Sequence, residues 1–375
     1  MTQTDGLDTD ALIIGAGPTG LTLGIALLLQ GRRVLVIDKH LSGLSYSRAI
    51  LINGETLQAL QPLGVCERLR ASGQAVDGLQ IHLNGDLRCT LRGATPSALS
   101  PILLPQLHTE QILLERYLQL GGNLQRGYCY AEPEGSCTGT AGWVELQAID
   151  RSQPPLRVHY QWLFGCDGAH SAVRSALGLA WRGRNQAEPA YAIDADLQQW
   201  SADTNASLHI SALGIALALR IGAHSVRIAG TTQAQCLAVL QGLPVQAITW
   251  ESAFNIQFRT AAGYGVGRAW LAGDAAHVHS PIGGRGMNMG MCDALALAAA
   301  VAQQDLQAYV KQRKPVAAHW VGLNSRVSWV TMGQGPVSRM LRWLLRCGLR
   351  LLLLCGGQRL LQGLFLRVVR GAPPS

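Results

Sequence analysis

Residues 11–38, ALIIGAGPTGLTLGIALLLQGRRVLVID, decide the fold of this chain. The apolar run at residues 11–14 predicts a buried strand, and a glycine-rich turn and an apolar helix over residues 21–30 follow it. A second apolar strand over residues 33–37 ends at Asp38. A strand, a Gly-x-Gly-x-x-Gly turn, a helix, a strand and an acid in this order indicate a dinucleotide-binding βαβ unit.

Each residue of this turn has a physical role in holding a dinucleotide. Gly15 makes the tight turn, Gly17 admits the pyrophosphate, and Gly20 lets the helix pack on the strand. The helix N-terminus directs backbone N–H groups at the phosphates, and Asp38 is expected to accept hydrogen bonds from the adenosine ribose. The cofactor-binding residues predicted here are Gly15, Gly17, Pro18, Thr19, Gly20, Asp38 and Lys39.

A second informative stretch, residues 271–290, reads LAGDAAHVHSPIGGRGMNMG. A small apolar strand over residues 269–272 precedes Gly273 and Asp274. A loop with a proline and a glycine cluster then leads into a helix of small residues over about 287–301. A strand that feeds a glycine-rich turn into a helix N-terminus presents backbone N–H groups to an electron-rich ligand.

Length and composition set the class of protein. A chain of 375 residues with 48% hydrophobic and 14% charged residues is long enough for two domains and too apolar for disorder. No interleaved basic and aromatic pattern suggests nucleic-acid binding. The nine cysteines form no CxxC pair and no metal-ligand spacing, so we expect no metal and a reducing, cytoplasmic location. The N-terminus lacks the pattern of a signal peptide.

A third motif, GCDGAHSAVR at residues 165–174, lies between the other two. With these three motifs in this order, nearly the whole chain resembles the single-component, FAD-dependent aromatic hydroxylases, the class A flavoprotein monooxygenases that include para-hydroxybenzoate hydroxylase. The resemblance implies an FAD cofactor. It also implies an α/β fold, in which a Rossmann-like FAD-binding domain carries an inserted β-sheet substrate domain and is followed by C-terminal helices.

The resemblance assigns domains and further contacts. The FAD-binding domain comprises residues 1–75, 104–178 and 264–336. The substrate domain comprises 76–103 and 179–263, and the amphipathic C-terminal helices comprise 337–375. Asp167 and Gly168 lie by the pyrophosphate and are linked to NAD(P)H use, and Gly273 and Asp274 hold the ribityl chain. The other implied cofactor contacts are Arg48, Gln106, Gly284, Gly286, Met287 and Asn288. Gln106 has a second interpretation, as a loop residue that caps the following helix.

The chemistry implied by the resemblance belongs to the cofactor. NAD(P)H reduces the flavin, O2 forms a flavin C4a-hydroperoxide, and this species hydroxylates an aromatic or polyketide-like small molecule. Pro281 borders substrate and flavin in the related enzymes. His277 either organises its loop through hydrogen bonds or transfers a proton. Arg285, where many relatives have glutamine, either sets a cation beside the flavin or points to solvent.

Other functions remain compatible with the same motifs. They are a quinone-precursor hydroxylase at the membrane, a flavin halogenase, a prenyl-chain reductase and a non-catalytic flavin-binding subunit. The halogenase signature Trp-x-Trp-x-Ile-Pro is absent. Oxygen consumption separates a hydroxylase from a prenyl reductase, and substrate-stimulated NAD(P)H oxidation separates an enzyme from a binding subunit.

The C-terminal residues are rich in leucine and arginine. Arg339, Arg342, Arg346 and Arg350 recur at steps of 3, 4 and 4, which places them on one helix face. Gly348 and the pair Gly356–Gly357 are expected to interrupt the helix. One interpretation packs a helix pair on the FAD-binding domain. The others are peripheral contact with a membrane and contact with a second copy of the chain.

Overall fold

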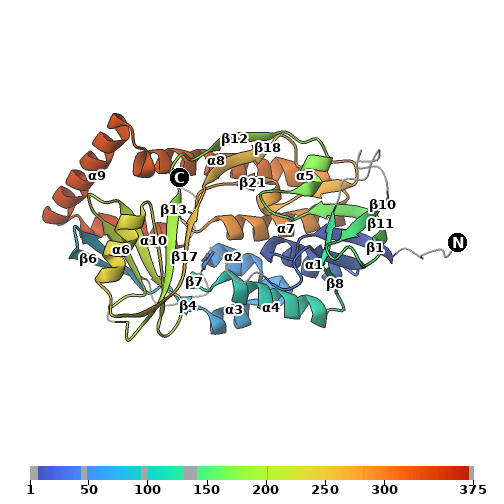
Figure 1. Ribbon diagram of the computed structural model, residues 1–375, viewed down its shortest axis with the longest axis horizontal. Helices are drawn as coiled ribbons and strands as arrows, with labels where there is room; N and C mark the ends of the chain where they lie inside the picture. The colour runs from blue at the N-terminus through green and yellow to red at the C-terminus, as the bar shows by residue number, and fades with distance from the viewer. Residues whose placement is uncertain are drawn as a thin grey trace.

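Two large β-sheets stand at opposite ends of the molecule, with helices between and above them (Figure 1). The computed structural model describes residues 7–43, 49–93, 100–130, 142–200, 202–281 and 283–370. Two small sheets connect these ends. One pairs β3 (Leu51–Ile52) and β4 (Gln74–Ala75) with β7 (Ile102–Leu103), and the other pairs β12 (Trp181–Asn185) and β21 (His277–Val278) with β18 (Gln257–Ala261).

The eight-stranded sheet has a parallel centre, with the strand order β20, β11, β1, β2, β8. These strands are β1 (Leu7–Ile14), β2 (Val34–Asp38), β8 (Asn123–Arg126), β11 (Leu156–Gly165) and β20 (Ala269–Leu271). Antiparallel strands β9 (Tyr128–Tyr130), β10 (Trp143–Ala148) and β19 (Gly265–Val266) extend it. The apolar runs of β1 and β2 are buried because helices cover the parallel sheet.

Helix α1 (Pro18–Leu29) lies between this sheet and two other helices, α4 (Gln106–Gln119) and α7 (Gly286–Gln303). Gly24 allows the close approach of α4, because a Cβ there would lie 2.8 Å from Cε2 of Tyr117. The Tyr117 hydroxyl lies 2.8 Å from the carbonyl oxygen of Asn123 and 3.0 Å from that of Val34, and its single proton can be donated to either, so the buried ring also ties α4 to β2 and β8. Helix α8 (Leu306–Met332) packs on α7 and runs across the top of the molecule in Figure 1.

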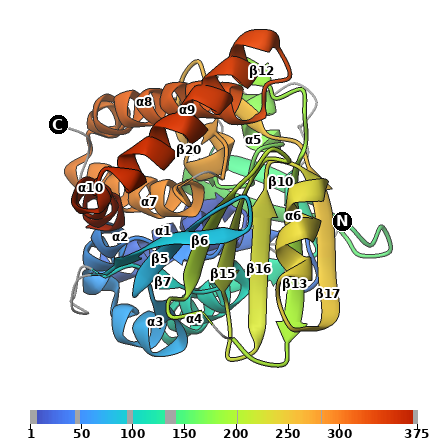
Figure 2. The same ribbon diagram turned by 90° about the vertical axis from the view of Figure 1, so that its left-hand side faces the viewer.

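The seven-stranded sheet has the order β17, β13, β16, β15, β14, β5, β6. The strands are β5 (Gly78–Leu83), β6 (Asp86–Arg92), β13 (Ala190–Leu197), β14 (Ala206–Ile210), β15 (Ile215–Arg220), β16 (Ser225–Gly230) and β17 (Val245–Phe254). Helix α6 (Gln233–Gln241) covers its outer face (Figure 2). The Asn84–Gly85 pair, a sequence typical of a hairpin turn, joins β5 to β6, with positive φ of 54° and 91° at the two turn residues.

Residues 54–72 are helical but broken into three pieces, α2 (Gly54–Ala59), a 3-10 turn (Gln61–Leu63) and α3 (Cys66–Ser72). Pro62 and the left-handed Gly64, φ 73°, separate these pieces. Gly348 does not interrupt the C-terminal helix, because a glycine in a helix interior costs only about 1 kcal/mol. Helix α9 (Pro336–Leu354) runs through it and ends before Gly356, φ 77°.

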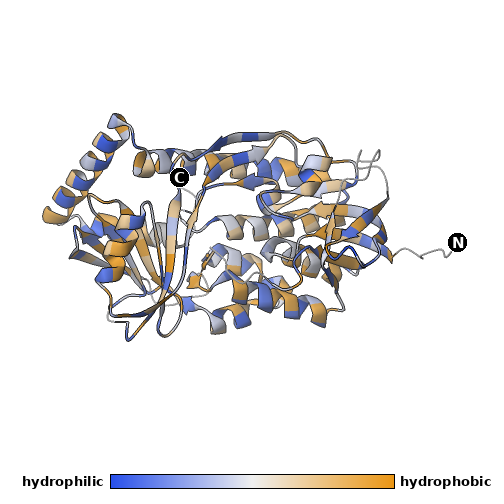
Figure 3. Ribbon diagram, viewed as in Figure 1, coloured by the Kyte–Doolittle hydropathy of each residue, from blue (hydrophilic) through white to orange (hydrophobic). Residues whose placement is uncertain are grey.

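The C-terminal helices pack on both parts of the molecule. Helix α9 contacts α8, and α10 (Gln358–Arg370) contacts α2 as well as β6. Leu349 and Leu353 of α9, with Leu361 and Phe365 of α10, contact the buried side chains of Ile81, Cys89 and Leu91. Hydrophilic and hydrophobic residues alternate along α9 (Figure 3). None of the helices within the described ranges is long and apolar enough to cross a membrane.

Candidate functional site

The carboxyl ends of four neighbouring parallel strands form one edge of the eight-stranded sheet. The register sets Ile14 of β1 beside Gly165 of β11 and Ile37 of β2, and it sets Gly165 beside Leu271 of β20. The first turn, Asp38 and the two other motifs follow these strand ends directly. Stretches more than 200 residues apart in the sequence therefore converge at the edge where open α/β sheets bind ligands.

The first glycine turn is shaped partly by packing and partly by open space. A Cβ on Gly15, φ +108°, would lie 2.3 Å from the carbonyl oxygen of Cys166, and one on Gly20 would lie 1.9 Å from the carbonyl oxygen of Gly15. A Cβ on Gly17 would meet nothing within 4 Å. Gly15 and Gly20 are thus required by the fold, whereas Gly17 keeps the space before the N-terminus of α1 clear.

Asp38 supports this turn. Its Oδ2 accepts a hydrogen bond from the Ala16 N–H at 2.8 Å, and its Oδ1 accepts one from the His40 N–H at 2.8 Å. A carboxylate has about four acceptor positions, so the expected ribose contact remains a prediction. Lys39 is exposed beside it.

Gln106 and Glu110 lie near Asp38, and Glu110 was not among the site residues predicted from the sequence. Gln106 is the first residue of α4, and its Nε2 donates to Oε1 of Glu110 at 2.7 Å. Burial raises the pKa of the Glu110 carboxyl, and the charge of Asp38 adds to the rise. The expected flavin contact of Gln106 would therefore come from a side chain that a buried acid already orients.

The Asp167–Gly168 turn has an unsatisfied acceptor. Oδ2 of Asp167 accepts hydrogen bonds from the N–H groups of Ala172 and Val173, at 2.7 and 3.3 Å. Oδ1 is buried and has no partner among the described residues. Gly168 has φ +81°, and a Cβ on it would meet nothing within 4 Å. This turn keeps free space beside Gly168 at the strand edge, with an unpaired carboxylate oxygen buried behind it.

Thr19 joins the first motif to the last. A Cβ on Gly273, φ +62°, would lie 2.6 Å from the Thr19 Oγ1, and a Cβ on Gly290 would lie 2.3 Å from the same atom. The start of α1, the turn at Gly273 and the first turns of α7 are therefore packed directly together. Asp274 follows Gly273 and is exposed.

A buried charged network holds the Gly273 turn, and it centres on Asp293 of α7. Its Oδ2 contacts the His277 Nε2 at 2.5 Å and accepts a hydrogen bond from the Gly273 N–H at 3.2 Å. Its Oδ1 accepts one from the Arg313 Nε at 2.6 Å. Burial alone raises the pKa of the Asp293 carboxyl, but His277 and Arg313 outweigh burial and lower it.

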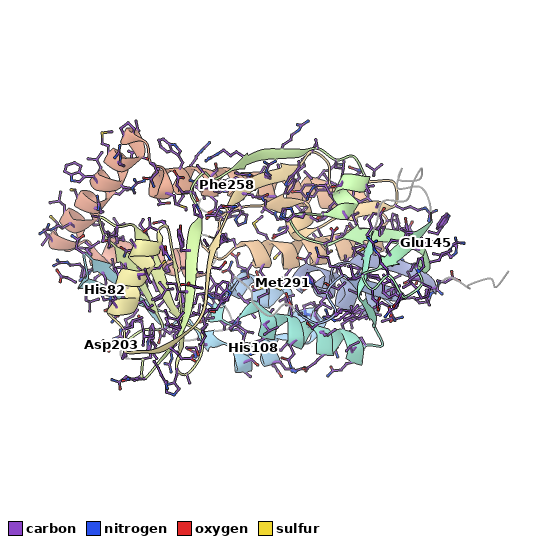
Figure 4. The ribbon with its side chains drawn as sticks, in the orientation of Figure 1. His82, His108, Glu145, Asp203, Phe258 and Met291 are labelled. Atoms are coloured by element: carbon purple, nitrogen blue, oxygen red, sulfur yellow. The ribbon has the colours of Figure 1, made fainter. Side chains whose placement is uncertain are left out.

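Asp293 and Arg313 were missed at the level of sequence. The sequence did contain a sign of this network, because Asp293 is the single charged residue of the mostly apolar helix α7. Met291, labelled in Figure 4, is fully buried on the same helix. An acid in such a helix must be paired, since an unpaired buried charge is too costly. His277, which lies 1% exposed in this network, has the loop-organising contact that was one of its two interpretations.

The N-terminus of α7 forms a second array of N–H groups at the site. The backbone N–H groups of Gly286, Met287 and Asn288 open the helix, where no intrahelical acceptor precedes them. The buried Asn288 side chain is engaged elsewhere, since it bonds the Asn53 N–H and the carbonyl oxygens of Leu51 and Gly284 at 2.7–2.8 Å. Any cofactor contact of Asn288 would thus come from its backbone.

The Arg285 side chain contacts an aromatic ring, and it forms no ion pair with an acid among the described residues. Its guanidinium lies over the Trp320 ring of α8, 3.8 Å from the ring centroid. Its charge also lowers the pKa of Glu55, which burial raises more strongly. Pro281 is exposed before the glycine cluster, and its carbonyl oxygen accepts from the Gly284 N–H. Arg48 falls outside the described residues.

The backbone cradle fits an ADP-containing cofactor. Two helix N-termini, two glycines with open space beside them and one unpartnered carboxylate oxygen lie along the same strand edge. Helix N-termini stabilise phosphate charge, and the acids can accept ribose or ribityl hydroxyl groups. These residues fit the pyrophosphate and sugar portions of FAD.

The sequence matches the model of a family described as an FAD binding domain, over residues 8–216 and 232–323. It is 34% identical over 340 residues to 6-methylpretetramide 4-monooxygenase of Streptomyces rimosus, which covers 81% of this chain and 59% of that protein. It is 29% identical over 369 residues to a rifampicin monooxygenase of Streptomyces venezuelae, which covers 90% and 74% of the two chains.

Solved structures show the same fold. The p-nitrophenol 4-monooxygenase of Pseudomonas putida superimposes with a TM-score of 0.77 at 21% identity, over 94% of this chain and 98% of that chain. The anhydrotetracycline hydroxylase of Streptomyces rimosus gives 0.72 at 25% identity, over 98% and 77%. The chain belongs to the FAD-binding family that includes the flavoprotein aromatic hydroxylases, which confirms the family and the two-part fold predicted from the motifs.

We expect the Asp274→Ala substitution to weaken FAD binding without unfolding the protein. Asp274 follows the Gly273 turn and is exposed at the cofactor edge, so its removal should leave cofactor hydroxyls unpaired. A loss of roughly 1–3 kcal/mol corresponds to an increase of about 5- to 150-fold in Kd. Flavin fluorescence titration measures it, with Asp274→Asn as the variant that keeps an acceptor. An unchanged Kd in both variants would contradict the ribityl assignment.

Proposed function

We propose that this chain is an FAD-dependent monooxygenase that uses NAD(P)H and O2 to hydroxylate an aromatic or polyketide-like small molecule. The observation that carries the proposal is the convergence of three motifs on four adjacent strand ends, with open space at Gly17 and Gly168. The named relatives, which act on polyketide-derived and phenolic compounds by their descriptions, support the substrate class.

The residues of this chain would bind and orient the cofactor and the substrate and shield them from water. Bound FAD would accept the hydride and activate O2. The start of α1 and the Asp167–Gly168 turn would hold the pyrophosphate. The Gly273–Asp274 turn would hold the ribityl chain, and Asp293 would keep that turn in place through the Gly273 N–H. The N-terminus of α7 would stabilise negative charge on the flavin ring.

The three candidate catalytic residues differ in what their surroundings support. His277 is buried against Asp293, which favours a positioning role over proton transfer to a substrate. Pro281 is exposed next to the glycine cluster, and we retain it as a candidate boundary between flavin and substrate. Arg285 is the N-cap residue of α7 and its guanidinium lies over Trp320, so we propose that it acts on the flavin through its electric field.

The Arg285→Gln substitution should lower the reduction potential of the bound flavin. Loss of a fixed cation disfavours the reduced anion, and a charge about 10 Å away in a medium of ε about 20 contributes about 1.5 kcal/mol. For a two-electron couple this is about 30 mV. Redox titration against dyes measures the potential, and Arg285→Lys should retain most of it. If the reduction potential of the flavin is unchanged in Arg285→Gln, then Arg285 interacts only with Trp320 and Glu55 and does not act on the flavin.

The proposal is tested by NAD(P)H oxidation with the FAD-loaded protein over a panel of phenols and polycyclic phenols. A hydroxylase should show substrate-stimulated oxidation, matching O2 consumption and little peroxide release. Stimulated oxidation without O2 consumption would indicate a reductase instead. Bound flavin with no stimulation by any compound, and no product by mass spectrometry, would favour the non-catalytic binding subunit.

A further inference from the structure

The positive charge of this protein is concentrated in its C-terminal part. Asp305 is the last acidic residue, and eleven lysines and arginines follow it. The sequence up to Asp305 has 20 basic and 23 acidic residues, a net charge of −3, so the region after it accounts for all of the overall +8. Part of this charge is internal, since Arg313 pairs with the buried Asp293, but seven of the eleven basic residues lie in α9 and α10.

Helix α9 presents large apolar side chains to solvent on the side away from the sheet. Leu349 and Leu353 pack inward, as described above. The helical period places four other side chains together on the opposite side, where they are 47–61% exposed: Val337, Met340, Leu344 and Leu351. Trp343 and Leu354, 57% and 74% exposed, lie along one edge of this group. An exposed apolar surface of this kind marks an interaction site.

The arginines of α9 divide between two roles. Arg342 turns inward, where its Nη1 donates to the carbonyl oxygens of Val330 and Gly333 at 2.9 and 2.6 Å and so ties α9 to the end of α8. Arg339 and Arg350 are exposed, and the helical period sets both next to Trp343. Arg359 and the 60%-exposed Leu360 repeat the pairing at the start of α10.

The position of the helix leaves this surface accessible. Figure 1 and Figure 2 show α9 along the outside of the molecule, on the side of the seven-stranded sheet, and Figure 3 shows its mixed hydropathy. The cofactor edge is formed by other elements, namely α1, α7 and the strand ends beside them. Binding at α9 therefore need not block the candidate site.

We propose that α9 and the start of α10 dock on an anionic lipid bilayer and lie in its interface. The chemistry selects this occupant, because phosphate headgroups would meet Arg339, Arg350 and Arg359 while the acyl boundary would take the apolar group beside them. A second copy of the chain bound through the same face would bring an equal positive charge against it, with no acid after Asp305 to offset it. Like charges placed together oppose such an interface.

Vesicle flotation of the full-length, FAD-loaded protein tests the proposal. We expect binding to vesicles of phosphatidylglycerol mixed with phosphatidylcholine, no binding to phosphatidylcholine alone, and release at 1 M salt. At about 1 kcal/mol for each arginine, the triple variant Arg339→Gln/Arg350→Gln/Arg359→Gln should bind about 100-fold more weakly. The matched control removes the same charge from exposed arginines elsewhere, as Arg151→Gln/Arg182→Gln/Arg268→Gln, and should bind as the wild type does.

A second variant tests the apolar part. Met340→Gln/Leu351→Gln changes two exposed side chains, so the fold should be retained, and it should also lose binding to anionic vesicles. Equal loss in the arginine triple variant and its control would reduce the effect to net charge and overturn the proposal. So would absence of binding to any vesicle, or a dimer in solution that Met340→Gln/Leu351→Gln dissociates, which would assign the surface to a second copy.

Discussion

Replacing Gly17 with valine should leave the protein folded and abolish the binding of FAD. In this structure a side chain at Gly17 would meet no atom within 4 Å, and the backbone at φ −74° and ψ −179° suits any residue. The fold therefore has room for valine, at a cost of about 1 kcal/mol for a poorer N-cap. The same room is where we place the pyrophosphate, so a branched side chain there would exclude it.

The measurement compares thermal unfolding with the flavin content of the purified protein. Wild-type protein should be yellow and should release FAD, not FMN, on heating, whereas Gly17→Val should be colourless and melt only a few degrees lower. Gly20→Ala is the contrasting variant, because its Cβ would lie 1.9 Å from the Gly15 carbonyl oxygen, and it should fail at the level of folding. Normal FAD retention in Gly17→Val, or FMN from the wild type, would contradict the assignment of the site.

Replacing Asp293 with leucine should strongly destabilise the protein. The substitution removes the partner of His277, of Arg313 and of the Gly273 N–H inside the core. Breaking a buried ion pair by removing one member typically costs about 3–5 kcal/mol. Urea unfolding of the FAD-free protein measures the loss. The control is Asp86→Asn, which breaks an exposed ion pair with Arg88 and should change little.

Asp293→Asn separates positioning from stability. The amide is similar in shape but uncharged, so the domain should fold at low temperature with a looser Gly273 turn. We expect weaker FAD binding in this variant under conditions where it is fully folded by circular dichroism. Wild-type FAD affinity in folded Asp293→Asn would show that the network supports the core and does not position the cofactor turn.

The same network predicts a pH dependence of stability. The pKa of Asp293 is lowered in the folded protein, so its stabilising contribution is fully present above the ordinary aspartate pKa of about 3.9. It is lost as the pH falls through the lower, folded-state pKa. The free energy of unfolding should therefore decrease below about pH 4 by more in the wild type than in Asp293→Asn. If the free energy of unfolding falls equally with pH in the two proteins, the stabilising role of the Asp293 charge would be contradicted.

The sequence by itself determined the cofactor-binding architecture. The βαβ unit from Ala11 to Asp38 could be predicted because its signals are local: an apolar strand, glycines at fixed offsets and an acid at the end of the next strand. The hairpin at Asn84–Gly85 and helix α7 were also predictable, since turn residues and periodicity specify them over a few positions. The order of the three motifs then indicated the family.

The tertiary structure alone decided which residues support the site and where the C-terminal helices lie. Asp293 and Arg313 meet the Gly273 turn only because β20, α7 and α8 pack together, and a side-chain pairing between elements has no local signal. The direction of Arg342 and the outward apolar face of α9 follow from packing on β6 and α8. Periodicity shows that a helix has two faces, but only its neighbours decide which face is buried.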